Sequence, residues 1–168
     1  DMMLREDEVN YELIDNCRIF HFGSLSMTDE PVRSATYAMV DYAKKKNKII
    51  SFDPNLRPPL WESEDLAAKQ IWYGIEQCDI LKIADNEIEW LTGTNDYDKG
   101  IEIIRQRTHA KLINVTLGPN GSIAYYGDHK VFMGPYLNKD TIETTGAGDT
   151  FGACALHAVL KHGLDNLT

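Results

Sequence analysis

The sequence predicts a single α/β domain of three layers, with helices on both faces of a mainly parallel β-sheet. Short apolar runs rich in β-branched and aromatic residues alternate with amphipathic stretches along most of the chain. This alternation is typical of parallel strands connected by helices. The 168 residues suffice for a substantial core. The sequence contains no repeat or low-complexity linker, so we place residues 1–168 in one domain.

The strands are expected in the apolar runs. The last two runs flank Gly127-Asp128, a pair that favours a tight hairpin turn. The six predicted strands are CRIFHFGS at 17–24, KIISFD at 48–53, DILKIA at 79–84, KLINVTLG at 111–118, SIAYYG at 122–127 and HKVFMGPY at 129–136.

The helices are expected in the amphipathic stretches between the strands. Pro31 suits the first turn of a helix that ends in lysines. Ser63 is a candidate N-cap of the next helix, and Gly93 is expected to end a shorter one. The predicted ranges are 30–47, 62–77, 85–93 and 97–108, with a final helix behind the loop 144–148.

The composition limits the classes of partner. A net charge of -9 and a pI near 4.9 argue against nucleic acid or an anionic membrane, and no apolar run reaches membrane-spanning length. Cys17, Cys78 and Cys154 show no C-x-x-C spacing and lie in or beside apolar stretches. We therefore expect buried free thiols in a reducing cytoplasm and no structural zinc site.

The sequence TTGAGD at 144–149 is a candidate site for an anion. It is neither a P-loop nor a G-x-G-x-x-G motif, because Phe151 occupies the position of the third glycine. Gly146, Ala147 and Gly148 are small enough to expose their N–H groups at the start of a helix. Asp149 then stands where it could orient a hydroxyl and take its proton, as phosphoryl transfer requires. The alternative is a tight turn with Asp149 as a helix cap.

Two further loops carry polar residues at strand ends. Asn86 and Glu89 share one face of a helical turn and could hold a hydrated magnesium ion, although a solvated acidic face would look the same. Asp53, Asn55 and Arg57 alternate, so an extended backbone would direct all three the same way. A structural turn stiffened by the neighbouring prolines is the alternative for this loop.

The segment VTLGPNG at 115–121 also follows a predicted strand. Its two glycines would let a phosphate or a ribose lie against the backbone, whereas a simple loop into the next strand is the alternative. In parallel sheets, ligands bind beyond the carboxyl ends of the strands. We therefore expect residues 53–61, 85–89, 116–121 and 144–149 at one edge of the sheet.

The ordered set FDPNLRPPLW, DNEIEWLTG, VTLGPNG and TTGAGDTF resembles the ribokinase-like (PfkB) carbohydrate kinases, and among them the bacterial and plant fructokinases. The resemblance covers essentially the whole chain. It implies a ribokinase-like fold and ATP-dependent transfer of a phosphoryl group to a sugar hydroxyl, with fructose as the expected sugar. A 2-keto-3-deoxygluconate kinase, whose acidic sugar would favour Arg57, and another sugar kinase of the family remain alternatives. So does a non-catalytic nucleotide-binding or regulatory chain.

The resemblance also implies roles for individual residues. Asp149 would be the catalytic base, and the N–H groups of the three preceding residues would form an anion hole. Asn86 and Glu89 would organise Mg²⁺ and the ATP phosphates, and a monovalent cation such as K⁺ would lie near Glu143, where the family usually has aspartate. The expected ATP-binding residues are Asn86, Thr116, Gly118, Gly121 and Gly148; the expected substrate-binding residues are Asp53, Asn55, Arg57 and Asp149; and the expected cation residues are Glu89, Glu143 and Thr145.

Members of this family are longer at both ends than this sequence. The chain therefore resembles an internal portion of such a kinase, without the glycine-rich sugar-binding stretch, the lid and the C-terminal wall of the adenine site. We expect the 168 residues alone to be inactive as a sugar kinase. The resemblance implies a cytoplasmic protein with a sugar and ATP as partners. The longer protein could form a homodimer.

Overall fold

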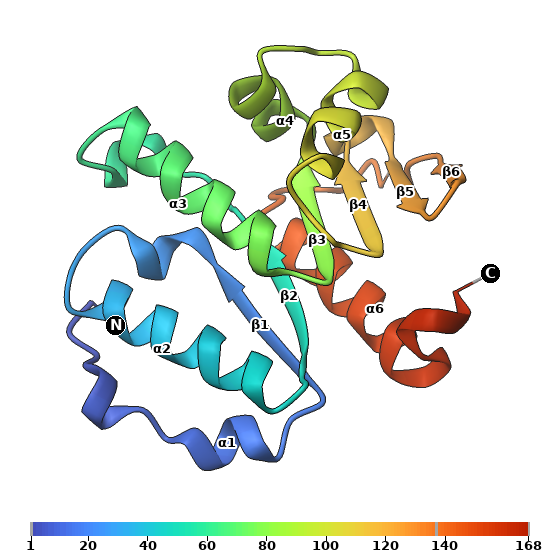
Figure 1. The fold of residues 1–168 in the computed structure, drawn as a ribbon. Helices are drawn as coiled ribbons and strands as arrows, with labels where there is room; N and C mark the ends of the chain where they lie inside the picture. The colour runs from blue at the N-terminus through green and yellow to red at the C-terminus, as the bar shows by residue number, and fades with distance from the viewer. Residues whose placement is uncertain (1, 137, 168) are drawn as a thin grey trace.

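The computed structural model describes residues 2–136 and 138–167 and has one six-stranded sheet in the order β1-β2-β3-β4-β5-β6 (Figure 1). The first four strands are parallel, and β5 and β6 add an antiparallel hairpin. The strands are β1 (Ile19–Gly23), β2 (Ile49–Asp53), β3 (Ile80–Ala84), β4 (Leu112–Thr116), β5 (Ser122–Tyr126) and β6 (His129–Met133).

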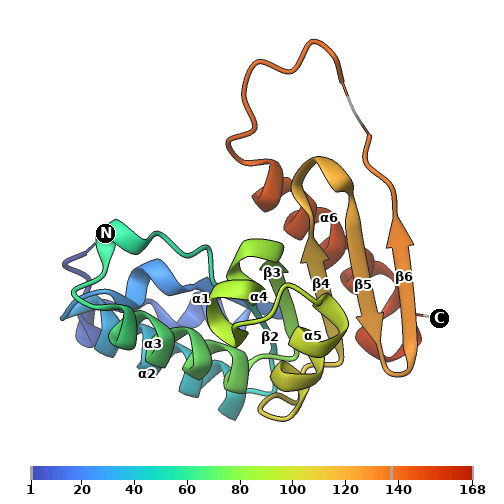
Figure 2. The ribbon, with the colours of Figure 1, turned by 90° about the horizontal axis from the view of Figure 1, so that it is seen from above.

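The sequential strand order decides where the helices lie. Each parallel strand pairs with the previous one, and right-handed crossovers between such neighbours place every connecting helix on the same face. Figures 1 and 2 show α1 to α5 on this face and α6 alone on the other. The helices are α1 (Tyr11–Asp15), α2 (Val32–Lys45), α3 (Glu64–Gln77), α4 (Asp85–Thr92), α5 (Tyr97–Arg105) and α6 (Ala147–His162), with 3₁₀ turns at Glu6–Glu8, Ser24–Met27, Pro58–Leu60, Gly118–Asn120 and Leu164–Asn166.

Two apolar cores of unequal size hold these layers together. The larger core lies between the sheet and α2 to α5, and Phe52 at its centre is fully buried. Gly74 of α3 lies directly over this ring, because a Cβ atom at Gly74 would come within 2.2 Å of the Phe52 ring. The smaller core, under α6, is formed by Ile80, Leu112, Val159 and Leu164. The predicted three-layer architecture is confirmed, with α6 as the helix of the third layer.

Most predicted element boundaries are confirmed. Ser63 caps α3 by accepting a hydrogen bond from the N–H of Leu66, and Gly93 ends α4 with a left-handed φ of 72°. Pro31 is the N-cap residue of α2 rather than part of its first turn. The short helix α1 was not predicted, because five residues are too few to show a helical period.

The expectation of three buried thiols is only partly correct. Cys78 is buried, and burial raises the pKa of its thiol to about 12. Cys17 is half-buried and Cys154 is exposed, because Cys154 lies on the face of α6 that points away from the sheet. In residues 2–136 and 138–167, no helix is both long enough and apolar enough to cross a lipid bilayer.

Candidate active site

The carboxyl ends of the parallel strands and the start of α6 meet around two adjoining cavities of about 350 and 260 Å³. Three residues line both cavities: His21 from β1, Asp53 from β2 and Asp149 from α6. Volumes of this size approach or match those of small-molecule sites. The expected convergence of polar residues at this edge is therefore confirmed for the loops at 53 and 149.

The start of α6 supplies hydrogen-bond donors. Gly146 is the N-cap residue, and its φ of 79° is a conformation that favours glycine. Within the described chain, the N–H groups of Gly146 and Gly148 have no acceptor, whereas the N–H of Ala147 donates to the carbonyl of Thr144. Two of the three N–H groups expected to bind an anion are thus available. The positive end of the helix dipole adds to their effect.

Asp149 lies in the first turn of α6 and is exposed toward the cavities. It is not the N-cap residue, so the alternative of a capping aspartate is wrong. Among the described residues it makes no ion pair or side-chain hydrogen bond. An unpaired carboxylate beside free N–H groups is suited to accept a proton from a bound hydroxyl.

The floor of the larger cavity carries polar side chains, of which Ser51, Asp53 and Asn114 are buried. Lys82 of β3 forms an ion pair with Asp53, with Nζ 2.9 Å from Oδ2. Asn114 of β4 pairs with Lys82 in the sheet, and its buried Nδ2 atom has no partner within residues 2–136 and 138–167. The Nδ1 atom of His21 lies 3.0 Å from the hydroxyl of Ser51. Polar groups in this position are unusual for a packed sheet face and indicate a binding function.

The surroundings shift the pKa of His21, an exposed residue of β1. Desolvation is the main cause and lowers the pKa of its imidazole below the ordinary value. The negative charges of Asp53 and Asp149 oppose this effect, and the positive charge of Lys82 adds to it. The pKa of His21 therefore depends on all three charged groups of the cavity.

Glu87, which no sequence motif identified, fixes the loop that follows β2. Its side chain is buried and accepts hydrogen bonds from the N–H of Leu56 at 2.7 Å and from the N–H of Ala84 at 2.8 Å. Desolvation raises the pKa of this carboxyl, although the two N–H donors partly offset the effect. The glutamate joins the loop after Asp53 to the end of β3. An acidic residue at the third position of a helix is the only sequence signal for this role.

Replacement of Glu87 by Gln is expected to lower the free energy of unfolding by about 1–3 kcal/mol. A Gln side chain offers one acceptor oxygen to two backbone donors, and its NH₂ group would face one of them. Chemical denaturation of both proteins measures the change. Glu89→Gln is the matched control, because Glu89 lies on the same helix but is exposed. Equal stabilities of the two variants would contradict the role of Glu87.

The predicted site residues of the loop after β2 differ in their position relative to the cavities. Asp53 and Asn55 line the smaller cavity, whereas Arg57 is exposed and its guanidinium donates to the carbonyl of Leu56. The expected extended backbone is wrong at Asn55, where φ is 47°. This left-handed residue breaks the alternation, so Arg57 does not share the direction of the other two.

The remaining predicted residues lie outside these cavities. Asn86 and Glu89 are exposed on α4, Thr116 is half-buried at the end of β4, and Gly118 is exposed in the turn that follows. Gly121 has a φ of 103°, and a Cβ atom there would meet the carbonyl of Met133 at 2.2 Å. Contact with the hairpin thus accounts for the glycine at this position.

Glu143 and Thr145 lie in the exposed segment before α6, which arches away from the sheet (Figure 2). The hydroxyl of Thr145 donates a hydrogen bond to the carboxylate of Glu143. In the part of the chain that the structure describes, no three or more His, Cys, Asp or Glu side chains gather as direct ligands of a metal ion. A cation here would need oxygen ligands of other kinds or bound water.

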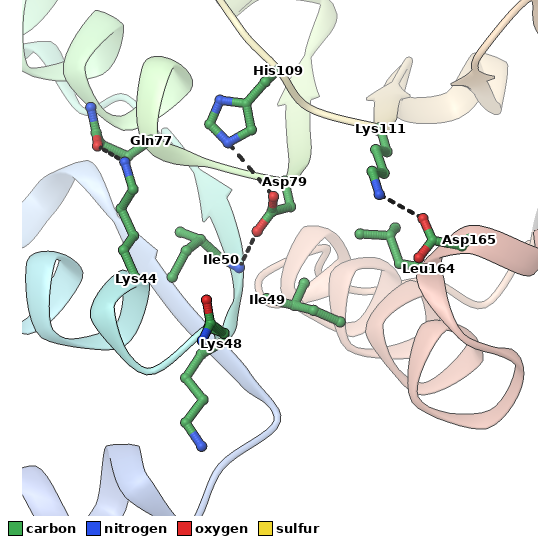
Figure 3. Close-up of a pocket in the computed structure, with 11 residues that line it drawn as sticks. Lys44, Lys48, Ile49, Ile50, Gln77, Asp79, His109, Lys111, Leu164 and Asp165 are labelled. Atoms are coloured by element: carbon green, nitrogen blue, oxygen red, sulfur yellow. Dashed lines mark hydrogen bonds and ion pairs between the residues drawn. The ribbon is translucent and has the colours of Figure 1, made fainter.

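A third cavity, of about 390 Å³, lies at the opposite edge of the sheet (Figure 3). Its charged side chains are already paired within the protein. Lys111 contacts Asp165 at 2.6 Å, and Asp79 accepts from the N–H of Ile50 and lies 3.6 Å from His109. These pairs connect neighbouring elements, so we assign this cavity no ligand.

Comparisons with known proteins identify relatives of the chain. The family model described as "pfkB family carbohydrate kinase" matches residues 1–165. "Probable fructokinase-2" of Arabidopsis thaliana is 41% identical over 160 residues, which cover 95% of this chain and 48% of the relative. "Fructokinase-1" of Zea mays is 39% identical over 161 residues, with 96% and 50% covered. The chain spans about half the length of these curated relatives.

Solved structures show the same fold. The fructokinase of Xylella fastidiosa with bound ATP superposes with a TM-score of 0.84 at 26% identity, over 96% of this chain and 50% of that chain. A fructokinase of Vibrio cholerae, in a form with bound fructose, ADP and calcium, gives a TM-score of 0.84 at 26% identity, over 95% and 50%.

Proposed function

Because this chain belongs to the pfkB family of carbohydrate kinases, we propose that it serves ATP-dependent transfer of a phosphoryl group to a sugar hydroxyl, with fructose as the sugar. The observation that carries the proposal is the position of Asp149. It is an unpaired carboxylate in the first turn of α6, one residue after the free N–H of Gly148 and at the wall of two cavities.

In the proposed reaction, Asp149 accepts the proton of the sugar hydroxyl while the oxygen attacks the γ-phosphorus of ATP. The bond between the γ-phosphorus and the β–γ bridging oxygen breaks, and ADP leaves. The N–H groups of Gly146 and Gly148 stabilise the negative charge on the transferred group. Asp53 and Asn55, which line the smaller cavity with Asp149, are placed to orient the sugar.

ATP is the proposed phosphoryl donor, and Mg²⁺ would accompany its phosphates and offset their charge. Asn86 and Glu89 are exposed on α4, which begins at the same edge of the sheet, and exposed groups of this kind suit contacts made through water. Thr116, Gly118 and Gly121 would contact the nucleotide. A monovalent cation near Glu143 and Thr145 remains part of the proposal, and a Vibrio cholerae fructokinase has been solved with potassium.

Fructose is preferred to an acidic sugar on the basis of Arg57. An acidic sugar requires a cationic partner, but Arg57 lies outside the cavities and donates to its own loop. A non-catalytic role is disfavoured because Asp149 and the free N–H groups are in place. The negative net charge supports small-molecule partners over nucleic acid, and the free thiols support a cytoplasmic location. A homodimer of the whole protein is part of the same proposal.

The proposal is tested on the gene product that carries these residues. ADP release is measured with ATP and Mg²⁺ against fructose, 2-keto-3-deoxygluconate, ribose and no sugar. We expect turnover to depend on fructose. Preference for the keto acid would support the alternative substrate, and ATP binding without turnover on any sugar would support a non-catalytic role.

A further inference from the structure

Lys82 belongs to a row of polar side chains that crosses the sheet beneath the start of α6. Phe52 pairs with Leu81, so the next residues, Asp53 and Lys82, are neighbours on β2 and β3. Lys82 in turn pairs with Asn114 on β4. The ammonium group lies 2.9 and 3.2 Å from the two carboxylate oxygens of Asp53. All three side chains line the same cavity as Asp149.

The fold itself does not require this ion pair. The side chains of Lys82 and Asp53 are only 12% and 10% exposed, and the desolvation of two charges can exceed the gain from their attraction. Other positions on the same face of the sheet, such as Ile80 and Leu112, are apolar and pack under α6. Apolar residues at positions 53 and 82 would fit the same architecture, so the pair needs a functional explanation.

The ammonium group of Lys82 also lies beside the first turn of α6, which contains Asp149. A Cβ atom added to Gly148 would lie 3.1 Å from Nζ of Lys82 and 3.7 Å from its Cε. The Lys82 side chain therefore occupies the space beside the Gly148 backbone. It connects a rigid strand to the residue immediately before the carboxylate that we assign to proton transfer.

The charges around the cavity leave Asp149 without a cation. Lys82 is paired with Asp53, and the buried Glu87 of α4 is a second acidic group near Asp53. No ion pair involves Asp149 among the described residues. A lysine paired with Asp149 instead would compete with the hydroxyl proton for this carboxylate.

We propose that Lys82 is a positioning residue of the site, which rests on the function proposed above. Bound to Asp53, its ammonium supports the backbone at Gly148 and sets the place of Asp149, while leaving the Asp149 carboxylate free to accept a proton. Lys82 acts through these two neighbours and takes no part in bond making or breaking.

The first test is kinetic and uses the gene product in its kinase-active form. Lys82→Met is expected to lower kcat by about 10–100-fold with the KM for ATP nearly unchanged, because small misplacements of a catalytic group cost rate rather than nucleotide affinity. Lys82→Arg, which keeps the charge, is expected to recover most of this loss. Lys99→Met is the matched control, since Lys99 is 73% exposed on α5. A wild-type kcat in Lys82→Met, or equal losses in all three variants, would overturn the proposal.

The second test needs no turnover and uses NMR of the His21 imidazole in the same gene product. The titration midpoint of His21 is expected to move to higher pH in Lys82→Met, which removes a positive neighbour. It is expected to move to lower pH in Asp53→Asn, which removes a negative one. The second variant decides the matter if the first fails to fold. Unmoved midpoints would overturn the charge arrangement, whereas a gene product inactive on every sugar would overturn the proposed function alone.

Discussion

Replacement of Asp149 by Asn is expected to lower kcat for sugar phosphorylation at least ~100-fold, while the Kd for ATP changes little. The loss follows from the role of the carboxylate, because an amide cannot accept the hydroxyl proton, and general-base catalysis typically contributes factors of this size. ATP binding is expected to persist, since the N–H groups at the start of α6 and the turns that we propose to contact the nucleotide are untouched. The measurement is steady-state kinetics on the kinase-active gene product, with ATP affinity determined by calorimetry.

Asp128→Asn provides the matched control for this substitution. Asp128 is an exposed aspartate in the turn between β5 and β6, so the same chemical change there should leave kcat and ATP affinity at their wild-type values. A near-normal kcat in Asp149→Asn would remove Asp149 from proton transfer and, with it, the main support for the proposed mechanism.

The 168-residue chain by itself is expected to show no fructose-dependent ADP release. Phosphoryl transfer to a sugar requires the hydroxyl to be held in line and water to be excluded. In the described structure, Asp149 is exposed and the segment before it extends away from the sheet. The site can therefore present the base and the N–H groups, but the described residues do not enclose a sugar.

The same chain is also expected to self-associate at micromolar concentration. Val131, Phe132 and Met133 of β6 are 57–60% exposed and Leu160 of α6 is 39% exposed, and neither outer strand of the sheet pairs with a further strand among the described residues. Exposed apolar strand edges favour association. Coupled-enzyme assays and light scattering on the purified chain measure both properties. Robust turnover with fructose by a monomer would show that these residues alone form a complete kinase.

The alternation of apolar and amphipathic segments was enough to predict the layers, the parallel sheet and the hairpin. It succeeded because the strands and the helices other than α1 show their own periods, and because right-handed crossovers leave little choice of arrangement. The position of Asp149 was predictable for a similar reason. The run of small residues marks where the helix begins, and Asp149 follows it directly, so the acid lies in the first turn.

The two residues that sequence reasoning missed, Lys82 and Glu87, owe their roles to contacts inside the folded protein. Lys82 stands alone in an apolar strand, and Glu87 is one of several acids in a helix, marked only by its third position. Their roles arise from neighbours that are remote in sequence, such as Asp53 for Lys82 and the N–H of Leu56 for Glu87. The direction of the Arg57 side chain was predicted wrongly because Asn55 has a left-handed backbone, which interrupts the alternation of side chains along an extended segment.

The sequential order of the strands has a consequence for synthesis on the ribosome. Each strand from β2 to β6 pairs with the one made immediately before it, so every new strand leaves the exit tunnel with its partner already available. Such local pairing favours rapid folding in the order of translation. The exception is α6, which returns across the sheet to the face opposite α1 to α5. Asp149 therefore joins Asp53 and Lys82 only after all six strands have been translated, and the nascent chain adds the carboxylate that we propose as the base to a sheet that is already assembled.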